Sequence, residues 1–574
     1  MQRLTGAPPP GPFFSDVVSP PPAGARARQS WRREHVYFGL HSFSREGIPD
    51  WHRNPFHNDA RAKDDAPWYE LADFDSTVGD IKCIWEPSRL DWLLAFAQRA
   101  AQGEPGELER LNTWLSDWAR NNPPYFGANW KCGQEAAIRV MHFAAAAMVL
   151  GQVHRPTPGL RSLLRLHLER IAPTIHYALG QQNNHATSEA AALFIGGTWL
   201  ATFGEARAQS WQRLGRRWLE RCAHDLIESD GTFSQYSVNY HRVMLDTYSL
   251  VEVWRRQLGL PGFSAKPLSR LRAATRWLYQ MVDPATGDAP NLGANDGARL
   301  LPLVDSDYRD YRPSLQLATT LFLGARALRS SGSWDQPLIW LRVAPAPETL
   351  GAPASTSFQS GGFFVLRRGH AAAYLRCPGY RFRPSQPDAL HLDFWLAGHN
   401  ILRDAGSYSY NAPAELLRHF DGTEAHNTVQ FDGRDQMPRI SRFLFGAWLK
   451  PRGMEPIRTR HGADVAAAGY RDAWGAEHHR RVSLSERTLR CVDRVAGQAR
   501  SATLRWRLQP GDWTLSGQTA RNGDLRLSVS IEPRAGRASL VQGKESRYYL
   551  SSEPLPVLEV ELPVPSLVTT TLTF

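Results

Sequence analysis

Two short polar segments contain the residue types needed for proton chemistry at carbon. The first is Gln182-Asn183-Asn184-His185, and the second is Asn239-Tyr240-His241-Arg242. An amide hydrogen-bonds a carboxylate, an imidazole accepts a proton, and a phenol donates one or, when ionised, accepts one. Together these groups could remove the acidic C–H proton beside a sugar carboxylate and protonate the leaving oxygen. That reaction is a β-elimination.

Each segment also has a purely structural interpretation. The triplet Asn183-Asn184-His185 precedes a helical pattern over 187–202, so it would lie at a helix N-terminus, where free N–H groups favour an anion. The alternative is plain helix capping by Asn184 or Thr187. Tyr240 precedes a helical pattern over 241–257. Nearby His241 and Arg242 could lower its pKa towards that of a working base; it could instead donate its proton, or be an ordinary core tyrosine.

The elements that must position these residues are first helical and then extended. Apolar residues recur at the spacing of one helix face over 108–118, 134–150, 160–171, 187–202, 207–228, 241–257, 268–282 and 314–329. Paired helices with Gly- or Pro-marked connections predict an α/α toroid, or a helical solenoid, over residues 36–340. After about residue 355 the period becomes two, as over 392–396, 504–508 and 525–531, with turn signals at Asp432-Gly433 and Asn522-Gly523.

The chain therefore reads as a multidomain α+β protein. Its 574 residues exceed what one hydrophobic core usually organises. We expect an N-terminal α/α toroid followed by a C-terminal antiparallel β-sandwich over 355–574. Residues 1–35 are rich in Pro and Arg and are predicted to form a disordered leader.

Charge and composition narrow the class of partner. The formal net charge of +11 favours an anionic partner, although a basic surface without a binding role is the alternative. No nucleic-acid-binding motif is present, so an acidic polysaccharide fits better than a nucleic acid. Twenty Trp and 17 Tyr suit stacking on sugar rings, although most of them should fill the cores. No apolar run is long enough to span a membrane.

Several familiar chemistries are excluded. The five cysteines are far apart and form no CxxC pair, so neither a disulfide framework nor a cysteine zinc site is indicated. No HExxH, P-loop or GxSxG motif is present. The N-terminus has Pro-rich runs where a signal peptide needs an apolar one, so no signal peptide is visible and the sequence as it stands is compatible with the cytoplasm.

A second group of candidates lies in the extended region. His391 and Asp393 share one face of a predicted strand, because side chains repeat every two residues. His391, Asp404 and His426 could bind a divalent metal, or they could form a hydrogen-bonded cluster without one. In the helical region, the polar loop 293–299 contains Asn295 and could shape a cleft or be an ordinary turn.

At these residues the chain resembles the heparinase II/III-type polysaccharide lyases, which include alginate lyases. The shared segments run from residue 79 through most of the chain: Gly79-Asp80-Ile81-Lys82, Trp85-Glu86, Ser88-Arg89, Gly127-Ala128-Asn129-Trp130 with Glu135 and Arg139, Asn183-Asn184-His185, Asn239-Tyr240-His241-Arg242, Asp404-Ala405-Gly406-Ser407-Tyr408-Ser409-Tyr410-Asn411 and Ala425-His426-Asn427-Thr428-Val429. The resemblance implies an α/α toroid and a β-sandwich with a cleft between them, and a periplasmic location.

The resemblance also implies residue roles. Asn184 and His185 would bind and neutralise the uronate carboxylate, with His185 a possible base. Tyr240 would protonate the glycosidic oxygen and, in some members, abstract the C5 proton. Asp404 and His426 match a structural metal site of some members, with zinc or calcium possible and no other cofactor required. Further substrate contacts are expected from Gln182, Asn183, Asn239, His241, Arg242, Asn295 and His391.

One departure from the family pattern affects these roles. The family often has His-x-His-x-Asp or His-x-Gln-x-Asp before the strand at 390–397, whereas this chain has Pro384 at the first position and Gln386 at the second. A catalytic histidine from the β-region and the metal are therefore both in question. His391 is the nearest imidazole that could substitute.

Two other functions are compatible with the sequence. A glycoside hydrolase would use paired carboxylates from among Glu189, Asp230 and Asp296. A non-catalytic acidic-glycan-binding protein of exopolysaccharide assembly would bind polymer without turnover. The sequence does not choose among heparan-type chains, alginate and a bacterial exopolysaccharide, between endo and exo action, or among oligomeric states.

Overall fold

The computed structural model describes residues 8–44, 46–533 and 536–574, and within it the chain divides into two compact units. The first, here called the helical unit, contains the residues up to Leu226 together with Arg242–Thr275 and Gly297–Leu350. The second, here called the sheet unit, contains Ile227–His241, Arg276–Asp296 and Gly351–Phe574. Two helices, α9 and α10, contribute residues to both units.

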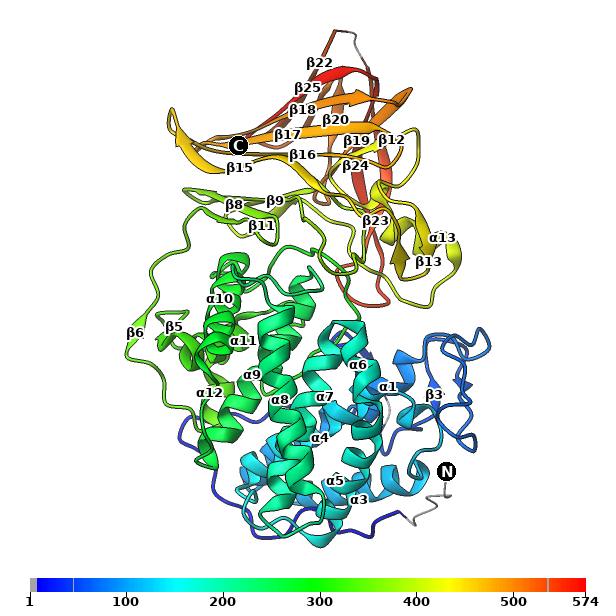
Figure 1. The fold of residues 1–574 in the computed structure, drawn as a ribbon, viewed down its shortest axis with the longest axis vertical. Coiled ribbons are helices and arrows are strands. Elements are labelled where there is room, and N and C mark those ends of the chain that lie inside the picture. The colour runs from blue at the N-terminus through cyan, green and yellow to red at the C-terminus, as the bar shows by residue number, and fades with distance from the viewer. Residues whose placement is uncertain (1–7, 45, 534–535) are drawn as a thin grey trace. The chain divides into compact units, whose positions relative to one another are not determined.

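The α-helices that make up or enter the helical unit follow the periodicity of the sequence closely (Figure 1). They are α1 Lys82–Ser88, α2 Asp91–Ala101, α3 Glu107–Asn121, α4 Gly133–Leu150, α5 Pro158–Ile171, α6 Ile175–Gln181, α7 Asn184–Ala201, α8 Ala208–Leu226, α9 Val238–Gln257, α10 Ala265–Met281, α11 Arg312–Ala318 and α12 Gln336–Trp340. Short strand pairs accompany them: β1 His35–Tyr37 with β2 His41–Phe43, β3 Arg53–Asn54 with β4 Ala60–Arg61, and β5 Ala325–Arg326 with β6 Glu348–Thr349.

The centre of this unit is formed by helices that are buried on nearly every side. All residues of α4 are buried, and α7 packs against α4, α5, α6 and α8. A helix that is buried all round is surrounded by other elements, which is the inner position of a toroid. The predicted helix over 314–329 ends early, because α11 passes at Thr319 into a π-turn that Gly324 closes with φ +66°.

The predicted leader is ordered wherever the structure describes it, from residue 8 to residue 35. Phe13 and Trp31 are fully buried, and the N–H groups of Phe13 and Phe14 donate to Asn112 Oδ1 at 2.8 and 2.9 Å. The prediction of disorder is therefore wrong for these residues, and residues 1–7 lie outside the described part. The prediction rested on the average composition, which gave no weight to the few aromatic side chains. These side chains supply enough apolar surface to anchor a Pro-rich segment.

The sheet unit contains three antiparallel sheets. The first has the order β11-β10-β9-β8-β7, the second β12-β19-β24-β23 and the third β15-β16-β17-β18-β25-β22-β21-β20. Their strands are β7 Thr356–Phe358, β8 Phe363–Arg368, β9 Ala371–Arg376, β10 Leu392–Leu396, β11 His399–Leu402, β12 Val429–Phe431, β15 Pro451–Arg460, β16 Ala463–Arg471, β17 Ala476–Leu484, β18 Thr488–Gly497, β19 Ser501–Arg507, β20 Thr514–Ser516, β21 Thr519–Asn522, β22 Leu525–Glu532, β23 Arg537–Glu545, β24 Glu553–Pro563 and β25 Ser566–Thr573. A small hairpin, β13 Arg439–Ser441 with β14 Leu444–Phe445, and helix α13 Ala414–Asp421 complete the unit.

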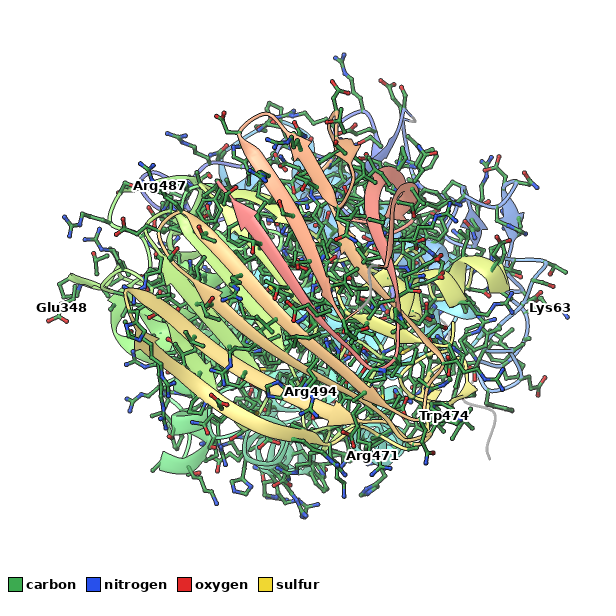
Figure 2. The ribbon with its side chains drawn as sticks, turned by 90° about the horizontal axis from the view of Figure 1, so that it is seen from above. Lys63, Glu348, Arg471, Trp474, Arg487 and Arg494 are labelled. Atoms are coloured by element: carbon green, nitrogen blue, oxygen red, sulfur yellow. The ribbon has the colours of Figure 1, made fainter. Side chains whose placement is uncertain are left out.

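The strands alternate between core and solvent as a half-buried sheet requires. In β18, Leu489 and Val495 point into the core, whereas Arg490 and Arg494 are exposed, and Figure 2 shows Arg494 on the outer side of the sheet. Strand β16 of the large sheet packs against β8 of the five-stranded sheet. Two sheets packed face to face form a sandwich, so the predicted fold class, an α/α toroid followed by an antiparallel β-sandwich, is confirmed.

The boundary between the units differs from the predicted one near residue 340. Two segments from the helical half of the sequence group with the sheets: Ile227–His241 and Arg276–Asp296. Trp277 shows why, because its ring meets Phe363 of β8 edge to face at 5.3 Å. Helical periodicity cannot reveal such a contact, since it depends on which partner covers the apolar face. Among the described residues, no helix is both long and apolar enough to cross a membrane.

Candidate active site

The first predicted segment lies at the junction of α6 and α7. Gln182 ends α6 in the left-handed region, with φ +53°, and Asn183 is the N-cap of α7, its side-chain oxygen accepting the His185 N–H at 2.9 Å. Capping is therefore done by Asn183 rather than by Asn184 or Thr187. Asn184 is buried and His185 is half-buried, and both occupy the first turn of the helix, where its dipole favours an anion.

A buried acid and a thiol lie beside His185. Cys132 Sγ is 4.0 Å from His185 Nδ1, and Glu189 follows one turn along the same face of α7. The Glu189 carboxyl fits against the start of α4, because a Cβ on Gly133 would lie 2.6 Å from its Oε1. Burial raises the pKa of Glu189 to about 8, although His185 acts in the opposite direction. Glu189 is therefore mostly neutral at pH 7.

This pKa predicts how stability depends on pH. An acid whose folded-state pKa is raised stabilises the fold fully below its unfolded value, near 4.5, and that stabilisation is lost as the pH rises towards 8. We expect Glu189→Gln to remove this pH-dependent loss. Between pH 4.5 and pH 8, the free energy of unfolding of the variant should therefore rise relative to that of wild type by on the order of 4 kcal/mol. Urea unfolding at several pH values measures the difference. A constant difference across that range would contradict the raised pKa.

The second predicted segment forms the N-terminus of α9. Ser237 Oγ accepts the Tyr240 N–H at 3.2 Å and donates to the Ala294 carbonyl at 2.6 Å. Gly293, at φ +75°, lies so close to the backbone of Tyr236 and Ser237 that any Cβ there would collide. Only glycine allows the 293–296 loop to pack against the start of this helix.

Tyr240 belongs to a group of three tyrosines, here called the tyrosine cluster. Its hydroxyl is 2.7 Å from that of Tyr410, and Tyr549 OH accepts the Tyr410 N–H at 2.8 Å. The rings of Tyr410 and Tyr549 meet edge to face at 6.1 Å, and Phe443 covers Tyr410 at 5.4 Å. The sequence analysis did not identify Tyr410 and Tyr549 as site residues.

The surroundings of Tyr240 favour its protonated form. Burial raises its pKa well above the ordinary value of a phenol, and Asp296 and the hydrogen bond with Tyr410 add to the effect. The expectation that His241 and Arg242 lower this pKa is therefore wrong. The environment of Tyr240 therefore favours the protonated phenol.

His241 and Arg242, which follow Tyr240 in the sequence, are held by aromatic contacts. The His241 ring stacks on Trp277 at 4.3 Å, and the Arg242 guanidinium lies 4.6 Å from the ring centre of Tyr308. Both side chains are only 1% exposed. This placement does not support direct substrate binding by either. Asn239 and Asn295 are also buried, and a substrate role for them stays a prediction.

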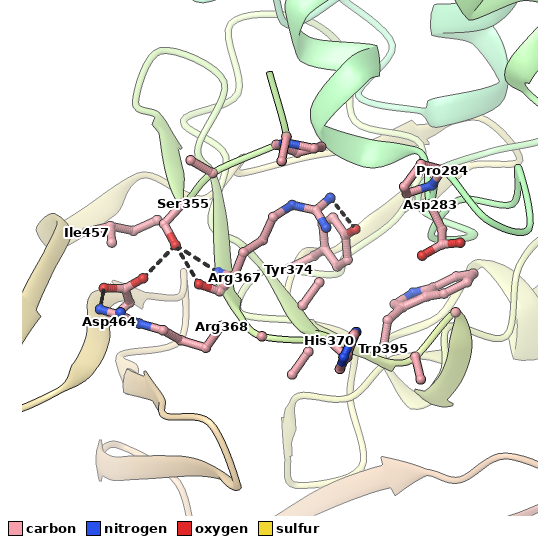
Figure 3. Close-up of a pocket in the computed structure, with 18 of the residues that line it drawn as sticks. Asp283, Pro284, Ser355, Arg367, Arg368, His370, Tyr374, Trp395, Ile457 and Asp464 are labelled. Atoms are coloured by element: carbon pink, nitrogen blue, oxygen red, sulfur yellow. Dashed lines mark hydrogen bonds and ion pairs between the residues drawn. The ribbon is translucent and has the colours of Figure 1, made fainter. Parts of the chain in front are cut away.

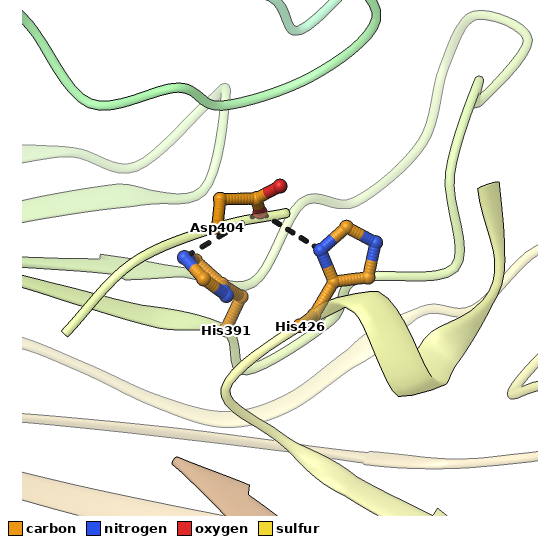
Figure 4. Close-up of side chains that lie close together, drawn as sticks. All are labelled: His391, Asp404 and His426. Carbon is orange, nitrogen blue, oxygen red and sulfur yellow. Dashed lines mark hydrogen bonds and ion pairs between the residues drawn. The ribbon is translucent and has the colours of Figure 1, made fainter. Parts of the chain in front are cut away.

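His391, Asp404 and His426 do come together (Figure 4). His426 Nδ1 donates to Asp404 Oδ2 at 2.8 Å, and His391 Nε2 is 3.6 Å from the same oxygen. Burial alone would raise the pKa of Asp404, but the two imidazoles outweigh it and hold that pKa at about 2. All three side chains are fully buried.

His391 is not placed to meet substrate or to bind a cation. Its Nδ1 accepts the Asn427 N–H at 2.9 Å, so the neutral ring must carry its proton on Nε2. A protonated nitrogen offers no lone pair to a metal, and complete burial removes the ring from any substrate. The suggestion that His391 replaces the missing family histidine is therefore wrong. Asp404 and His426 remain as candidate ligands.

Of the carboxylates proposed for hydrolysis, Asp230 has a structural role. Both oxygens of Asp230 are occupied by main-chain N–H groups, those of Thr232 at 3.0 Å and Gly361 at 2.9 Å. Asp230 thus organises a turn. Glu189 is mostly neutral at pH 7, and the influence of Asp296 falls on Tyr240.

Solved structures of several polysaccharide lyases share this fold. A structure of heparinase III has a TM-score of 0.65 and 16% identity, over 88% of this chain and 78% of that one. Heparan sulfate lyase from Pedobacter heparinus has a TM-score of 0.56 and 17% identity, covering 94% and 80%. Chondroitin AC lyase from Streptomyces coelicolor, solved with chondroitin sulphate, has a TM-score of 0.57 and 13% identity, covering 85% and 74%.

Family models match both parts of the sequence. The heparinase II/III N-terminus model matches residues 30–301, and the heparinase II/III-like C-terminal model matches residues 351–547. No curated protein matches the chain. The two models together cover well over half of its length, which confirms the predicted family and the predicted enzyme class, polysaccharide lyase. The chain belongs to the heparinase II/III-like family.

Proposed function

We propose that this lyase cleaves a uronic-acid-containing polysaccharide by β-elimination, with Tyr240 as the general acid. The observation that carries the proposal is the Tyr240–Tyr410 pair, whose hydroxyls are 2.7 Å apart in a buried setting that raises the pKa of Tyr240. A phenol that holds its proton firmly is suited to release it only to a strongly basic leaving alkoxide.

Asn184 and His185 would act on the other side of the reaction. The amide of Asn184, at the N-terminus of α7, would hydrogen-bond the uronate carboxylate and stabilise the enolate-like charge that develops there. His185 Nε2 or Nδ1 would take the C5 proton, which acidifies once the carboxylate is neutralised.

The proton and electron count closes without an external oxidant or reductant. The C5–H bond breaks towards His185, and its electrons form the C4–C5 double bond. The C4–O4 bond then breaks, and O4 takes the proton of Tyr240. Tyr410 would relay a proton from water to the tyrosinate, giving up its own proton through their shared hydrogen bond and taking one from water, and His185 would lose its proton to water. The products are an unsaturated uronate at a new non-reducing end and a free anomeric hydroxyl at the new reducing end of the leaving chain.

The test is ultraviolet absorbance of the unsaturated uronate while the protein is incubated with heparan-type chains, alginate and uronate-containing bacterial exopolysaccharides. A rise in absorbance with one polymer would support elimination and name the substrate class. Chain cleavage without absorbance would favour hydrolysis, and binding without cleavage would favour a glycan-binding role. Either of those results would overturn the proposal.

We propose in addition that His426, oriented by its hydrogen bond to Asp404, holds a structural divalent cation through Nε2. Among the described residues, His426 Nε2 and the amide oxygen of the buried Gln386 have no hydrogen-bond partner, and a cation would satisfy such groups. The ion would fix the segments around residues 404 and 426 and takes no part in the steps above.

Metal analysis tests this assignment directly. We expect about one equivalent of zinc or calcium by plasma mass spectrometry, its loss in Asp404→Asn, and a melting temperature lowered by several degrees in chelator. Arg490→Gln, on the solvent face of β18, is the matched control and should keep the metal. Metal-free protein with an unchanged melting temperature in chelator would show that the Asp404–His426 hydrogen bond suffices.

A further inference from the structure

A cavity of about 980 Å³ lies in the sheet unit (Figure 3), and no residue of the tyrosine cluster lines it. Two tight hairpin turns form one wall: Gly369-His370 joins β8 to β9, and Ala397-Gly398 joins β10 to β11. The turn at Asp283-Pro284-Ala285 and the segment Ala352–Ser357 form the opposite side. Gly398, at φ +80°, packs closely against the 283–286 turn, because an added Cβ would lie 3.0 Å from Thr286 Cγ2.

Two arginines and two aspartates of the described residues line this cavity, and only Arg368 and Asp464 among them form an ion pair. Both carboxylate oxygens of Asp464 already accept hydrogen bonds. Oδ1 accepts from Arg368 and Thr459, both at 2.6 Å, and Oδ2 accepts from Ser355 at 2.6 Å. Arg367 has no carboxylate partner among the residues that the structure describes. Its Nη2 donates to the Gln280 carbonyl at 2.5 Å and to Tyr374 OH at 3.0 Å, which fixes the guanidinium in place.

The remaining lining combines polar and apolar surface. The exposed imidazole of His370 stands at the rim, and Trp395 and the prolines at 284 and 353 contribute apolar surface. Asp283 Oδ1 is occupied by its own turn, accepting the N–H groups of Ala285 and Thr286. An uncompensated guanidinium beside a carboxylate and apolar rings fits a sugar that carries both a carboxylate and hydroxyl groups better than it fits a simple anion.

Strand β9 relates the position of the cavity to that of the tyrosine cluster. The cavity lies at the Gly369-His370 end of β9, and Arg376 at the other end lies 5.8 Å from the ring centre of Tyr236, four residues before Tyr240. Six residues of antiparallel strand span about 17 Å. A polysaccharide that reached both places would have to follow the protein surface, because every residue of β9 is buried, so its path would be longer than this strand.

We propose that this cavity is a remote binding site for an acidic sugar residue of the polymer, with Arg367 contacting the carboxylate and His370 assisting at the rim. The inference rests on the proposed polysaccharide substrate but not on the elimination chemistry. It implies that long chains bind more tightly than short ones, because only they occupy the cavity and the reaction site together.

Direct binding tests the site independently of turnover. End-labelled polymannuronate and heparosan chains, and the trisaccharide of each, are titrated by fluorescence polarisation into protein carrying Tyr240→Phe, which prevents cleavage. Adding Arg367→Met, which keeps the apolar stem, is expected to weaken binding of the preferred long chain about tenfold, the size of one charge-assisted hydrogen bond. Trisaccharide binding should not change.

Arg458→Met is the matched control. Arg458 is an exposed cation of β15, and it points to the opposite strand face from Ile457 and Thr459, which line the cavity. His370→Ala, in an exposed turn, is the second variant should Arg367→Met lower the melting temperature, and it should show the same dependence on chain length. Equal effects of Arg367→Met and Arg458→Met, equal effects on both chain lengths, or no binding of either long chain would overturn the proposal.

The same experiment separates this inference from the proposed reaction. Binding that depends on Arg367, with no unsaturated product from wild type, would leave the cavity standing and remove the elimination. Unsaturated product from wild type, with binding indifferent to Arg367, would remove the cavity and leave the elimination standing.

Discussion

Tyr240→Phe is expected to lower kcat by about 10²- to 10⁴-fold while changing KM little, because it removes only the proton that the leaving oxygen needs. The ring and its packing remain, so the fold should be unaffected. Initial rates of unsaturated-uronate formation measure the effect. The raised pKa of Tyr240 adds a second expectation: wild-type activity should persist to alkaline pH, because the acid stays protonated beyond the ordinary range of a phenol.

Two companion variants sharpen this result. Tyr410→Phe should cost less than Tyr240→Phe, because Tyr410 acts only through its hydrogen bond, and it should move the alkaline limit of activity downwards. Tyr69→Phe removes a hydroxyl from an exposed tyrosine and should leave the rate unchanged. A fully active Tyr240→Phe enzyme would remove the tyrosine from the reaction.

The sequence could identify Tyr240 but not its surroundings. A helical pattern places a residue on an element, so the position of Tyr240 near the start of α9 was predictable. Its hydrogen-bond partner is 170 residues away on an irregular segment, and no periodicity relates the two. The direction of the pKa shift of Tyr240 could not be predicted for the same reason. Neighbours in sequence suggested cations, whereas burial, Asp296 and Tyr410 determine the direction.

For the fold as well, the sequence predicts the elements but not the contacts between distant residues. Periodicity predicted α4, α7 and the strands β10 and β22 closely, because side-chain spacing within an element reflects which face is buried. Composition was misleading for residues 8–35, which were predicted to be disordered. Phe13 and Trp31 in this segment are buried, and the segment is anchored by partners far along the chain. Residue type was misleading for His391. An imidazole suggests chemistry, but the complete burial of this side chain excludes contact with substrate.

Asn184→Ala should produce the second large loss, about 10²- to 10³-fold in kcat. An amide that stabilises charge developing on the carboxylate contributes more in the transition state than in the ground state, so KM should change much less than kcat. Asn184→Asp tests the same point with the opposite charge. It preserves the shape, but its carboxylate would repel the uronate, so the loss should be at least as large and KM should rise.

The expected pattern also distinguishes binding from helix structure. Asn183, not Asn184, caps α7, so Asn184→Ala should leave the melting temperature nearly unchanged, and Gln359→Ala, at an exposed amide, should change neither stability nor rate. His185→Gln should abolish the fall in rate at low pH that a neutral imidazole base imposes, in addition to slowing the reaction. A loss of stability in Asn184→Ala that matched its loss of rate would assign the residue to the fold. A loss of rate alone would place it against the uronate carboxylate, because no other group in the proposed reaction requires a neutral donor at that helix terminus.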